Sequence, residues 1–327
     1  MQTFFNLSAC LDLKTFIKFY ALTLCGRTGV FMRINSKYLI KLAIFALIGS
    51  LCVLFATSCG SQKNTIVDGL EYILLDSGDA YEVYGIGDHT GGELTVPAEI
   101  RGLPVRGIGA SAFAGNKTVK NLKISNGISY IGEGAFSDCD SLESISLPAT
   151  LTKIDDRAFE DCGNLFSMDL GGVLHIGDYA FSKCIGLHEA ELPADLQALG
   201  DYAFFDAWNL EKINISAGLT EIGAFTFAGC RNLPSVNLHD GITKIGESAF
   251  KDCLELSEVW IGFNVSEIGI HAFQGCEALS YAHFKNYDGW NVDSDSTPFS
   301  NNSLTDPSYS AMCLSSRYDE SVWQRKN

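Results

Sequence analysis

The sequence predicts a repeat solenoid, in which one short supersecondary unit is stacked on copies of itself to form a single elongated domain. Its main signal is a phenylalanine, preceded by alanine in seven cases out of eight, that recurs at steps of 22 or 23 residues. The eight positions are Phe113, Phe136, Phe159, Phe181, Phe204, Phe227, Phe250 and Phe273. An aliphatic residue lies five positions before each of them, and another lies six positions after it. Because a unit of this length cannot bury its own apolar side chains, the copies must stack.

Each unit reads I-G-x-x-A-F-x-x-C-x-x-L-x-x-I-x-L-P-x-x-L-x-x. We expect the A-F-x-x-C segment to form a tight helical turn and the L-x-x-I-x-L segment to form a strand, because its last apolar residues alternate with outward ones. A second short extended segment is expected to end at I-G. The one short unit lacks a residue between Leu170 and Ile176, in a turn that contains Gly171 and Gly172. A turn can lose a residue without displacing an inward side chain, so the register continues through the array.

The order of these motifs resembles that of the BspA-like family of leucine-rich repeat proteins, and the resemblance covers about residues 66–327. We therefore expect a leucine-rich repeat solenoid with right-handed, strand-rich coils of 23 residues and short helical turns. Eight repeats are expected at residues 108–285, after an N-terminal unit at 66–107 and before a C-terminal cap or tail at 286–327. The resemblance also implies an association with adhesion to host proteins or to other cells.

The N-terminal region predicts export. Residues 42–55 are apolar and uncharged, follow three basic residues, and precede the small-residue sequence A-T-S-C-G. A basic segment, a short apolar segment and a small-residue cleavage site are the parts of an export signal, expected at residues 1–58. The cysteine after the small residues resembles a bacterial lipobox, which implies that Cys59 carries a lipid and that residues 59–65 link the anchor to the array. The protein is then a lipoprotein of the bacterial cell envelope, at the cell surface.

Met32 stands where such a signal normally begins, directly before Arg33. We therefore expect residues 1–31 to be an incorrectly assigned start. The alternative is a single transmembrane anchor with residues 1–31 genuinely translated, although about 20 apolar residues are needed to span a bilayer comfortably. Both alternatives place the repeats outside the cytoplasm.

The charge balance limits the kinds of partner. The chain has 23 Lys and Arg against 39 Asp and Glu, a formal net charge of −16. A protein needs basic patches on its surface to bind nucleic acids or anionic membranes, so neither is an expected partner. Contact with a membrane is expected through the lipid anchor only.

The cysteines follow the repeat. Eleven cysteines in an exported protein would ordinarily indicate a disulfide framework. Six of them, however, occupy one repeat position, three residues after the phenylalanine: Cys139, Cys162, Cys184, Cys230, Cys253 and Cys276. Because Asn116 and Ala207 fill the same position in other repeats without the loss of a partner cysteine, we expect an inward ladder of free thiols. The sequence has no CxxC or Cys/His ligand spacing, so neither a metal nor a cofactor is expected.

No sequence motif indicates catalysis. The G-x-S-x-G, P-loop and G-x-G-x-x-G patterns are absent, and the six histidines form no HxxxH or HxH pair. The sequence therefore predicts a protein that is not an enzyme. The alternative, an active site gathered from separate repeats, lacks a pocket-forming insertion in the array.

The outward strand face is the candidate binding surface. The two residues that flank the central apolar residue of L-x-x-I-x-L point outward. They are small and polar in the first repeats, acidic in the middle, and include aromatic side chains and a histidine in the last two repeats. The candidate ligand-binding residues are Asp169, Glu189, Glu191, Lys212, Asn214, Asn237, Glu258, Trp260, Tyr281 and His283.

Trp260 and Tyr281 stand where other repeats have serine or asparagine, and Trp and Tyr are enriched in binding hot spots. We expect the face to bind a protein ligand, such as a host matrix or cell-surface protein. One alternative is that both side chains only pack beneath the tail that carries Trp290. Another is a carbohydrate-binding or enzyme-accessory lipoprotein, in which Trp260, Tyr281 and Trp290 stack on sugars.

Overall fold

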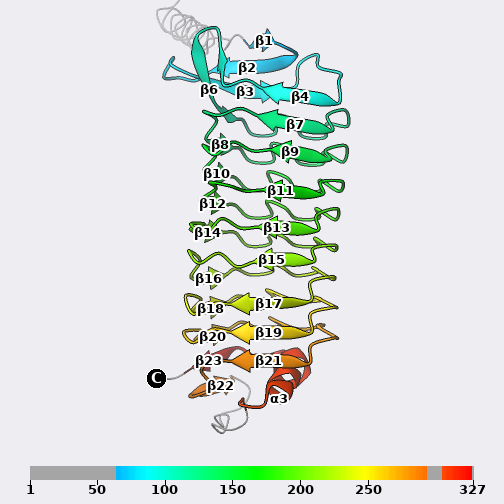
Figure 1. Cartoon of the computed structure of the whole chain (residues 1–327), viewed down its shortest axis with the longest axis vertical. Coiled ribbons are helices and arrows are strands. Elements are labelled where there is room, and N and C mark those ends of the chain that lie inside the picture. Colours follow the sequence, from blue (N-terminus) through cyan, green and yellow to red (C-terminus); the bar gives the residue numbers. More distant parts are fainter. Residues whose placement is uncertain (1–63, 293–303, 326–327) are drawn as a thin grey trace, which may run out of the picture. The chain divides into compact units, whose positions relative to one another are not determined.

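A computed structural model describes residues 64–292 and 304–325, which belong to the compact unit Lys63–Asn327. This unit is a column of stacked coils, each of which contributes one longer and one shorter strand to two separate faces (Figure 1). The leucine-rich repeat solenoid expected from the sequence is confirmed. Among the described residues, helix is confined to α3 (Pro307–Met312) and the π-helix η1 (Cys313–Arg317). No helix in this part of the chain has the length and apolar character that a membrane span requires.

The L-x-x-I-x-L segments form the longer strands, and these pair in parallel with the same repeat position opposite in each neighbour. A six-stranded sheet holds β4 (Glu93–Val96), β7 (Asn121–Ile124), β9 (Ser144–Ser146), β11 (Ser167–Asp169), β13 (Glu189–Glu191) and β15 (Lys212–Asn214). A three-stranded sheet holds β17 (Ser235–Leu238), β19 (Glu258–Ile261) and β21 (Tyr281–Phe284). We call the outer surface of these two sheets the strand face.

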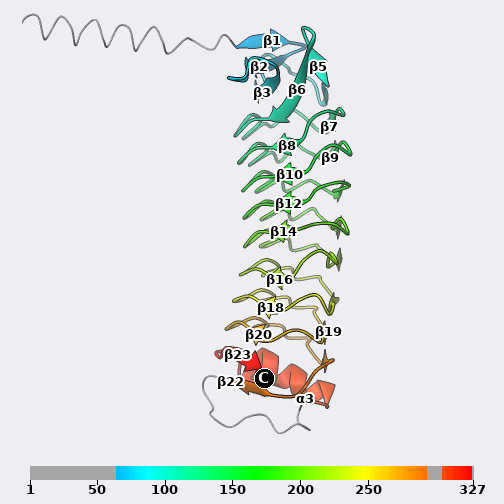
Figure 2. The ribbon, with the colours of Figure 1, turned by 90° about the vertical axis from the view of Figure 1, so that its left-hand side faces the viewer.

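The segments that end at I-G form the shorter strands on the second face (Figure 2). They are β8 (Tyr130–Ile131), β10 (Lys153–Ile154), β12 (His175–Ile176), β14 (Ala198–Leu199), β16 (Glu221–Ile222), β18 (Lys244–Ile245) and β20 (Glu267–Ile268). Their last residue is buried in every coil except that of β14, where Leu199 is half-buried. Two residues per coil are sufficient here because each strand pairs with the equivalent strand of at least one neighbouring coil.

The N-terminal unit covers the first coil. Its strands β1 (Thr65–Val67), β2 (Leu70–Leu74) and β3 (Tyr81–Gly85) are antiparallel, and β3 then pairs in parallel with β6 (Leu103–Ile108). Strand β5 (Glu99–Ile100) pairs antiparallel with β6. Strand β4 in the same unit pairs in register with β7, so the strand face begins one coil before the first phenylalanine.

The eight phenylalanines form one continuous stack inside the column. Consecutive ring centroids are 4.9–5.6 Å apart and the rings are inclined by 6–19°. Every ring is at most 2% exposed. Such offset stacking adds to the free energy of burying each ring, so the repeat that is clearest in the sequence also stabilises the column along its length.

The turn around A-F-x-x-C, expected to be helical, is a pair of consecutive β-turns in the coils of the array. Its N–H groups alternate between two kinds of acceptor. Ala114 donates within the turn to the carbonyl of Ser111 (3.1 Å), whereas Phe113 donates to the carbonyl of Ala135 in the next coil (2.7 Å). The residue two positions before each phenylalanine has a left-handed backbone in all eight coils, with φ of 52–58°. This alternation, which a helix cannot provide, ties each coil to its successor.

The predicted cysteine ladder is confirmed. All six thiols are buried and free. Each donates to the carbonyl oxygen of the phenylalanine in the preceding coil, as from Cys139 to Phe113 (3.1 Å) and from Cys230 to Phe204 (3.3 Å). Burial raises the pKa of the Cys139 thiol to about 12, and burial also raises the pKa of Cys230. These two thiols therefore remain protonated as donors and are poor nucleophiles.

Both sheets are interrupted at one level, which we call the sheet break: β14 does not pair with β16, and β15 does not pair with β17. Pro234 occupies the position at which Glu211 donates its N–H to the carbonyl of His188 (2.8 Å) in the coil before. Proline has no N–H and cannot continue that row, which accounts for the missing pairing of β15 with β17. The turn continues across the break, because Phe204 donates to the carbonyl of Thr226 (2.8 Å).

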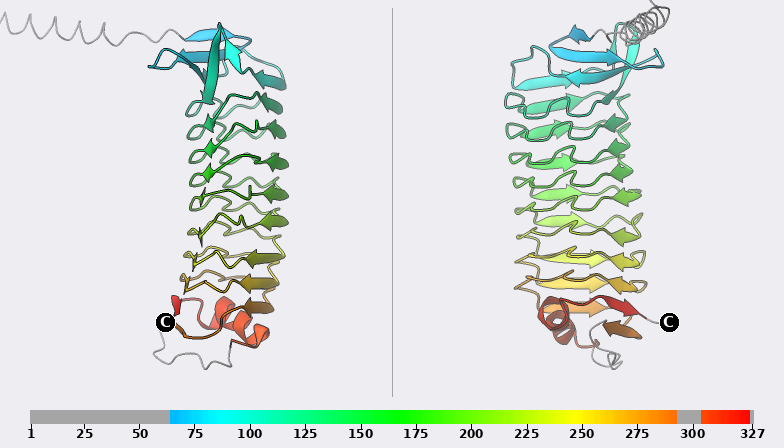
Figure 3. Two further views of the ribbon diagram at one scale, coloured as in Figure 1. Left: turned by 60° about the vertical axis from the view of Figure 1, so that its left-hand side comes forward. Right: turned by 180° about the vertical axis from the view of Figure 1, so that it is seen from behind.

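The C-terminal segment closes the last coil (Figure 3). Strand β23 (Trp323–Arg325) lies antiparallel between β20 and β22 (Trp290–Val292). The rings of Trp290 and Trp323 pack against Phe284, and both are at most 1% exposed. His271, in the last turn, donates its N–H to the carbonyl of Asp319 (2.6 Å), which replaces the missing next coil.

Candidate binding surfaces

The strand face carries all ten candidate residues, and the sheet break divides them into two groups. Before the break lie the acidic group and its neighbours, Asp169, Glu189, Glu191, Lys212 and Asn214. After it lie Asn237, Glu258, Trp260, Tyr281 and His283. The structure therefore brings the candidates together as two clusters and not as one continuous surface.

The cluster before the break consists mostly of exposed charges. Lys212 Nζ lies 3.9 Å from Glu189 Oε2 and 3.7 Å from Glu191 Oε1, and all three side chains are at least 60% exposed. Ion pairs with this exposure contribute less than about 1 kcal/mol to stability. These side chains remain available to a partner in solution.

Asn214 differs from its neighbours, because the backbone of the preceding coil engages its amide. Its Oδ1 accepts the N–H of Leu192 (2.8 Å) and its Nδ2 donates to the carbonyl of Leu192 (3.0 Å). The side chain is therefore part of the edge of the six-stranded sheet. Asn214 thus bonds to the backbone of a neighbouring coil, whereas Asp169 accepts only the N–H of Gly171 in its own coil (2.9 Å).

The cluster after the break is held together by its own contacts, and we call it the aromatic cluster (Glu258, Trp260, Tyr281 and His283). Parallel pairing places Trp260 beside His283 and Glu258 beside Tyr281. The Trp260 and His283 rings stack with centroids 5.4 Å apart, and His283 Nε2 lies 2.8 Å from Glu258 Oε1. Tyr281 is 50% exposed, with its ring 6.4 Å from that of His283. The cluster is thus pre-organised and open to solvent.

The C-terminal tail packs elsewhere in the described part of the chain. Trp290 and Trp323 contact Phe284, the buried last residue of β21, whereas Trp260 and Tyr281 both lie against His283 on the outward side. The suggestion that Trp290 serves as a sugar-stacking platform is wrong, because its ring is fully buried.

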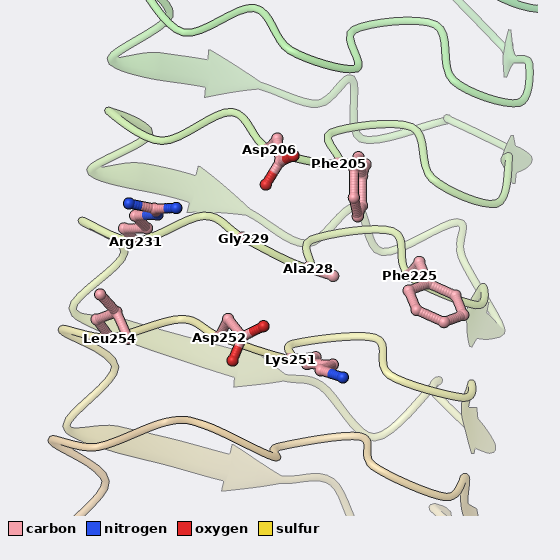
Figure 4. A pocket seen from close by; sticks show the side chains of 9 residues that line it. All are labelled: Phe205, Asp206, Phe225, Ala228, Gly229, Arg231, Lys251, Asp252 and Leu254. Atoms are coloured by element: carbon pink, nitrogen blue, oxygen red, sulfur yellow. The ribbon is translucent and has the colours of Figure 1, made fainter.

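A hollow that sequence reasoning missed lies on the side of the column formed by the A-F-x-x-C turns. We call it the turn pocket; it has a volume of about 520 Å³ and spans three consecutive coils (Figure 4). Its lining residues are Phe205, Asp206, Phe225, Ala228, Gly229, Arg231, Lys251, Asp252 and Leu254. The signal was present in the sequence as the small pair Ala228–Gly229, which aligns with Phe205–Asp206 and Lys251–Asp252 in the adjacent repeats.

In the residues that the structure describes, no group of three or more His, Cys, Asp or Glu side chains is arranged to hold a metal ion. The predicted signal region and the predicted lipidation site, Cys59, lie outside the described residues.

The profile of the BspA type leucine rich repeat region matches residues 106–216, 170–280 and 197–312, which together make up more than half of the chain. The chain belongs to the BspA-type leucine-rich repeat family. A leucine-rich repeat protein of T. pallidum has a similar structure, with a TM-score of 0.53 and 26% identity over 66% of this chain and 91% of that one. A leucine-rich repeat protein from Bacteroides ovatus shares the fold, with a TM-score of 0.53 and 23% identity over 68% of this chain and 71% of that one. No match was found among curated proteins.

Proposed function

We propose that this BspA-type protein is an exported bacterial lipoprotein, anchored through Cys59, whose strand face binds a protein ligand at the cell surface. The ligand is a host matrix protein or a protein of another cell, and the role is adhesion, not catalysis. The export signal and the lipobox-like sequence support the location. Membership of the BspA-type family supports the binding role.

The observation that carries the proposal is the aromatic cluster. Among the described coils, the equivalent positions of β9 hold Ser144 and Ser146, and neither position contributes to the core. Trp260 and Tyr281 therefore have no packing role that the array requires. Aromatic side chains held in place by neighbouring hydrogen bonds and ring contacts lose little conformational entropy on binding, which makes them suitable anchors for a partner.

The acidic group on the other side of the sheet break supports a partner with basic patches. Glu189 and Glu191 lie in one strand, Asp169 in the strand before it, and the chain has a net charge of −16. Opposite charges across an interface accelerate association and are sensitive to salt. Binding should therefore weaken as the ionic strength rises.

The test is a binding assay of the full-length chain against a panel of purified extracellular-matrix proteins and against whole cells. The double variant Trp260→Ala/Tyr281→Ala is compared with Ser144→Ala/Ser146→Ala, which changes the same repeat positions on β9. We expect only the former to reduce affinity, by about 2 kcal/mol or more. Unchanged binding by a folded Trp260→Ala/Tyr281→Ala variant would exclude the aromatic cluster, and binding only to a glycan array would replace the protein ligand with a carbohydrate.

Anchoring has its own test. Metabolic labelling with a fatty acid in a bacterial host should label the wild-type chain and not Cys59→Ala, which should leave the membrane fraction. A labelled Cys59→Ala variant would exclude this anchor without affecting the strand-face proposal.

A further inference from the structure

The sheet break separates two sides of the column at the same level. On the second face, the residue after each shorter strand donates its N–H to the coil before, as Gly200 does to Ile176 (2.9 Å) and Gly246 does to Ile222 (2.8 Å). Among the described coils, this bond is missing only at Gly223, which follows β16. On the strand face, β15 does not pair with β17. Both faces therefore lose their backbone bonds between the same two coils.

The strands of the second face contain the groups that pairing requires. Thr220 and Gly223, on either side of β16, both have N–H groups. One coil later, the residue equivalent to Thr220 does donate, from Thr243 to the carbonyl of Thr220 itself (2.8 Å). Pro234 removes a donor on the strand face only. Strands β14 and β16 are therefore able to pair, although they are unpaired in this structure.

The break also exposes part of the core. Leu199 in β14 and Ile213 in β15 point inward, yet both are half-buried, as is Ile215 directly after β15. At the position of Ile213, the neighbouring coils hold Ala190 and Val236, which are at most 3% exposed. Because burial of apolar side chains is favourable, these exposed residues favour an arrangement that closes the break.

The turn side of the same two coils remains connected. Backbone bonds cross the break from Tyr202 to Ala224 (2.9 Å), from Phe204 to Thr226 (2.8 Å) and from Asp206 to Ala228 (2.8 Å). The rings of Tyr202 and Phe225 stack with centroids 4.6 Å apart, and the guanidinium of Arg231 lies 4.5 Å from the centre of the Trp208 ring. The column is therefore fastened along one side and open on two others.

The interior widens slightly at this level. The ring centroids of Phe204 and Phe227 are 5.6 Å apart, which is the largest step in the phenylalanine stack. Beyond the longer strands, one side chain spans the break: His239 Nε2 lies 2.7 Å from the carbonyl oxygen of Ser216. Since Nδ1 of the same ring accepts the N–H of Gly241 (3.0 Å), Nε2 carries the proton and donates to Ser216. This bond limits how far the two coils separate.

We propose that the sheet break is a hinge, at which the two parts of the column tilt about the turn side. The structure shows the open arrangement. In the closed arrangement β14 pairs with β16 and Leu199 is buried. Burial of Leu199 favours closing and the missing N–H of Pro234 opposes it, so the protein populates both arrangements. Hinges of this kind confine a large movement to a few residues between rigid parts.

The hinge has a consequence for ligand binding, which rests on the function proposed above. Glu189 and Glu191 lie before the break and the aromatic cluster lies after it, so tilting changes the distance between the two clusters. A partner that contacts both clusters binds best at one hinge angle and shifts the population toward it. The tilt itself requires no ligand, so its test is independent of the binding proposal.

The test measures distances between two spin labels in the full-length chain by double electron–electron resonance. The labels are attached to ketone-bearing unnatural residues, because the chain has 11 cysteines. One pair, at Thr152 and Thr243, crosses the break. The control pair, at Arg106 and Gln197, occupies the same repeat position over the same number of coils, where the sheet is continuous. We expect the distance distribution of the crossing pair to be about two-fold wider or more. Equal widths in the two pairs would overturn the hinge.

Two variants should move the crossing pair in opposite directions. Pro234→Ser gives this coil the residue of the next one, in which Ser257 donates to the carbonyl of Pro234 (2.9 Å). It should shift the distribution to shorter distances and narrow it. His239→Ala removes the bond to Ser216 and should shift the distribution to longer distances.

The control pair should not respond to either variant. Folded variants that both leave the crossing pair unchanged would exclude the hinge, as would equal shifts in the control pair. The comparison of the two pairs in the wild type decides the question if a variant does not fold. No ligand is present in these measurements, so a failure of the strand-face proposal would leave their result unchanged.

Discussion

The inward positions carry the same types of residue in every coil of the array, whereas the residue types at the outward positions change from one coil to the next. The phenylalanine stack runs unbroken through eight coils, and the cysteine position accepts only small side chains. On the strand face the same coils carry serine, glutamate or tryptophan without a change of backbone. The difference teaches that the inward set determines the fold, and that the outward set is free to acquire partners.

The largest test of this comparison is Phe204→Ala. The ring is fully buried between those of Phe181 and Phe227, so its removal leaves a cavity that the stacked coils cannot close. We expect the free energy of unfolding to fall by about 3–5 kcal/mol. Chemical denaturation measures it, and Trp260→Ala is the outward control, which should cost much less. An unaltered melting temperature for Phe204→Ala would contradict the inward register.

Alkaline pH should weaken the inward set selectively. Burial raises the pKa of Cys139 to about 12 and also raises that of Cys230, while unfolded thiols ionise near 8.5. The stabilisation that these two protonated thiols provide is therefore complete below about pH 8.5, and it is lost as the pH rises toward their pKa values in the folded protein. The free energy of unfolding is measured from pH 8 upward for the wild type and for Cys230→Ala. It should fall less steeply with pH in Cys230→Ala, with a difference between the two slopes of about 1 kcal/mol per pH unit. Equal slopes of the free energy of unfolding against pH in the two proteins would show that the fold does not raise the pKa of the Cys230 thiol.

Ala207→Cys extends the ladder to the coil that has alanine at the cysteine position. The neighbouring coils show the bond that the new thiol would make, from its S–H to the carbonyl of the phenylalanine before it. We expect a gain of about 1 kcal/mol in the free energy of unfolding. Thermal and chemical unfolding of this variant, compared with Cys230→Ala as the reverse change, provide the check. A loss of stability in Ala207→Cys would mean that the coil before the sheet break is too tightly packed for a thiol.

The smallest effect is expected for Lys212→Ala. Its ion pairs with Glu189 and Glu191 are long and exposed, so the free energy of unfolding should change by no more than about 0.5 kcal/mol. The same variant increases the negative charge of the strand face and should accelerate association with a basic partner. A stability loss of the size expected for Phe204→Ala would remove the distinction between the two sets of positions.

The sequence predicted the coils, their register and the cysteine ladder because stacking imposes one period on every inward residue. It did not predict the β-turns around A-F-x-x-C, since they depend on left-handed backbone at residues such as Arg157 and Tyr179, which composition does not indicate. The missing pairing of β15 with β17 had a visible cause in Pro234, but its effect depends on the partner carbonyl in another coil.

The candidate surfaces were less predictable than the fold. The residues of the strand face could be named from the sequence, because inward and outward residues alternate along each strand. The hydrogen bonds between Asn214 and Leu192 could not, because they depend on contacts between coils. The turn pocket required a comparison of consecutive repeats at positions that carry no strand. Its Ala228–Gly229 floor is unremarkable until it is aligned with the bulkier pairs on either side.

The one-way hydrogen bonding of the turns has a consequence for how the protein is made. Each turn donates N–H groups to carbonyls that are synthesised later, as Phe113 does to Ala135, and the last donor, His271, awaits Asp319 near the C-terminus. A chain that emerges N-terminus first from a ribosome or a translocon therefore always has one growing end whose donors are satisfied only by water. Each new coil supplies the carbonyls that the turn before it needs, and Asp319 supplies the one that the last turn needs.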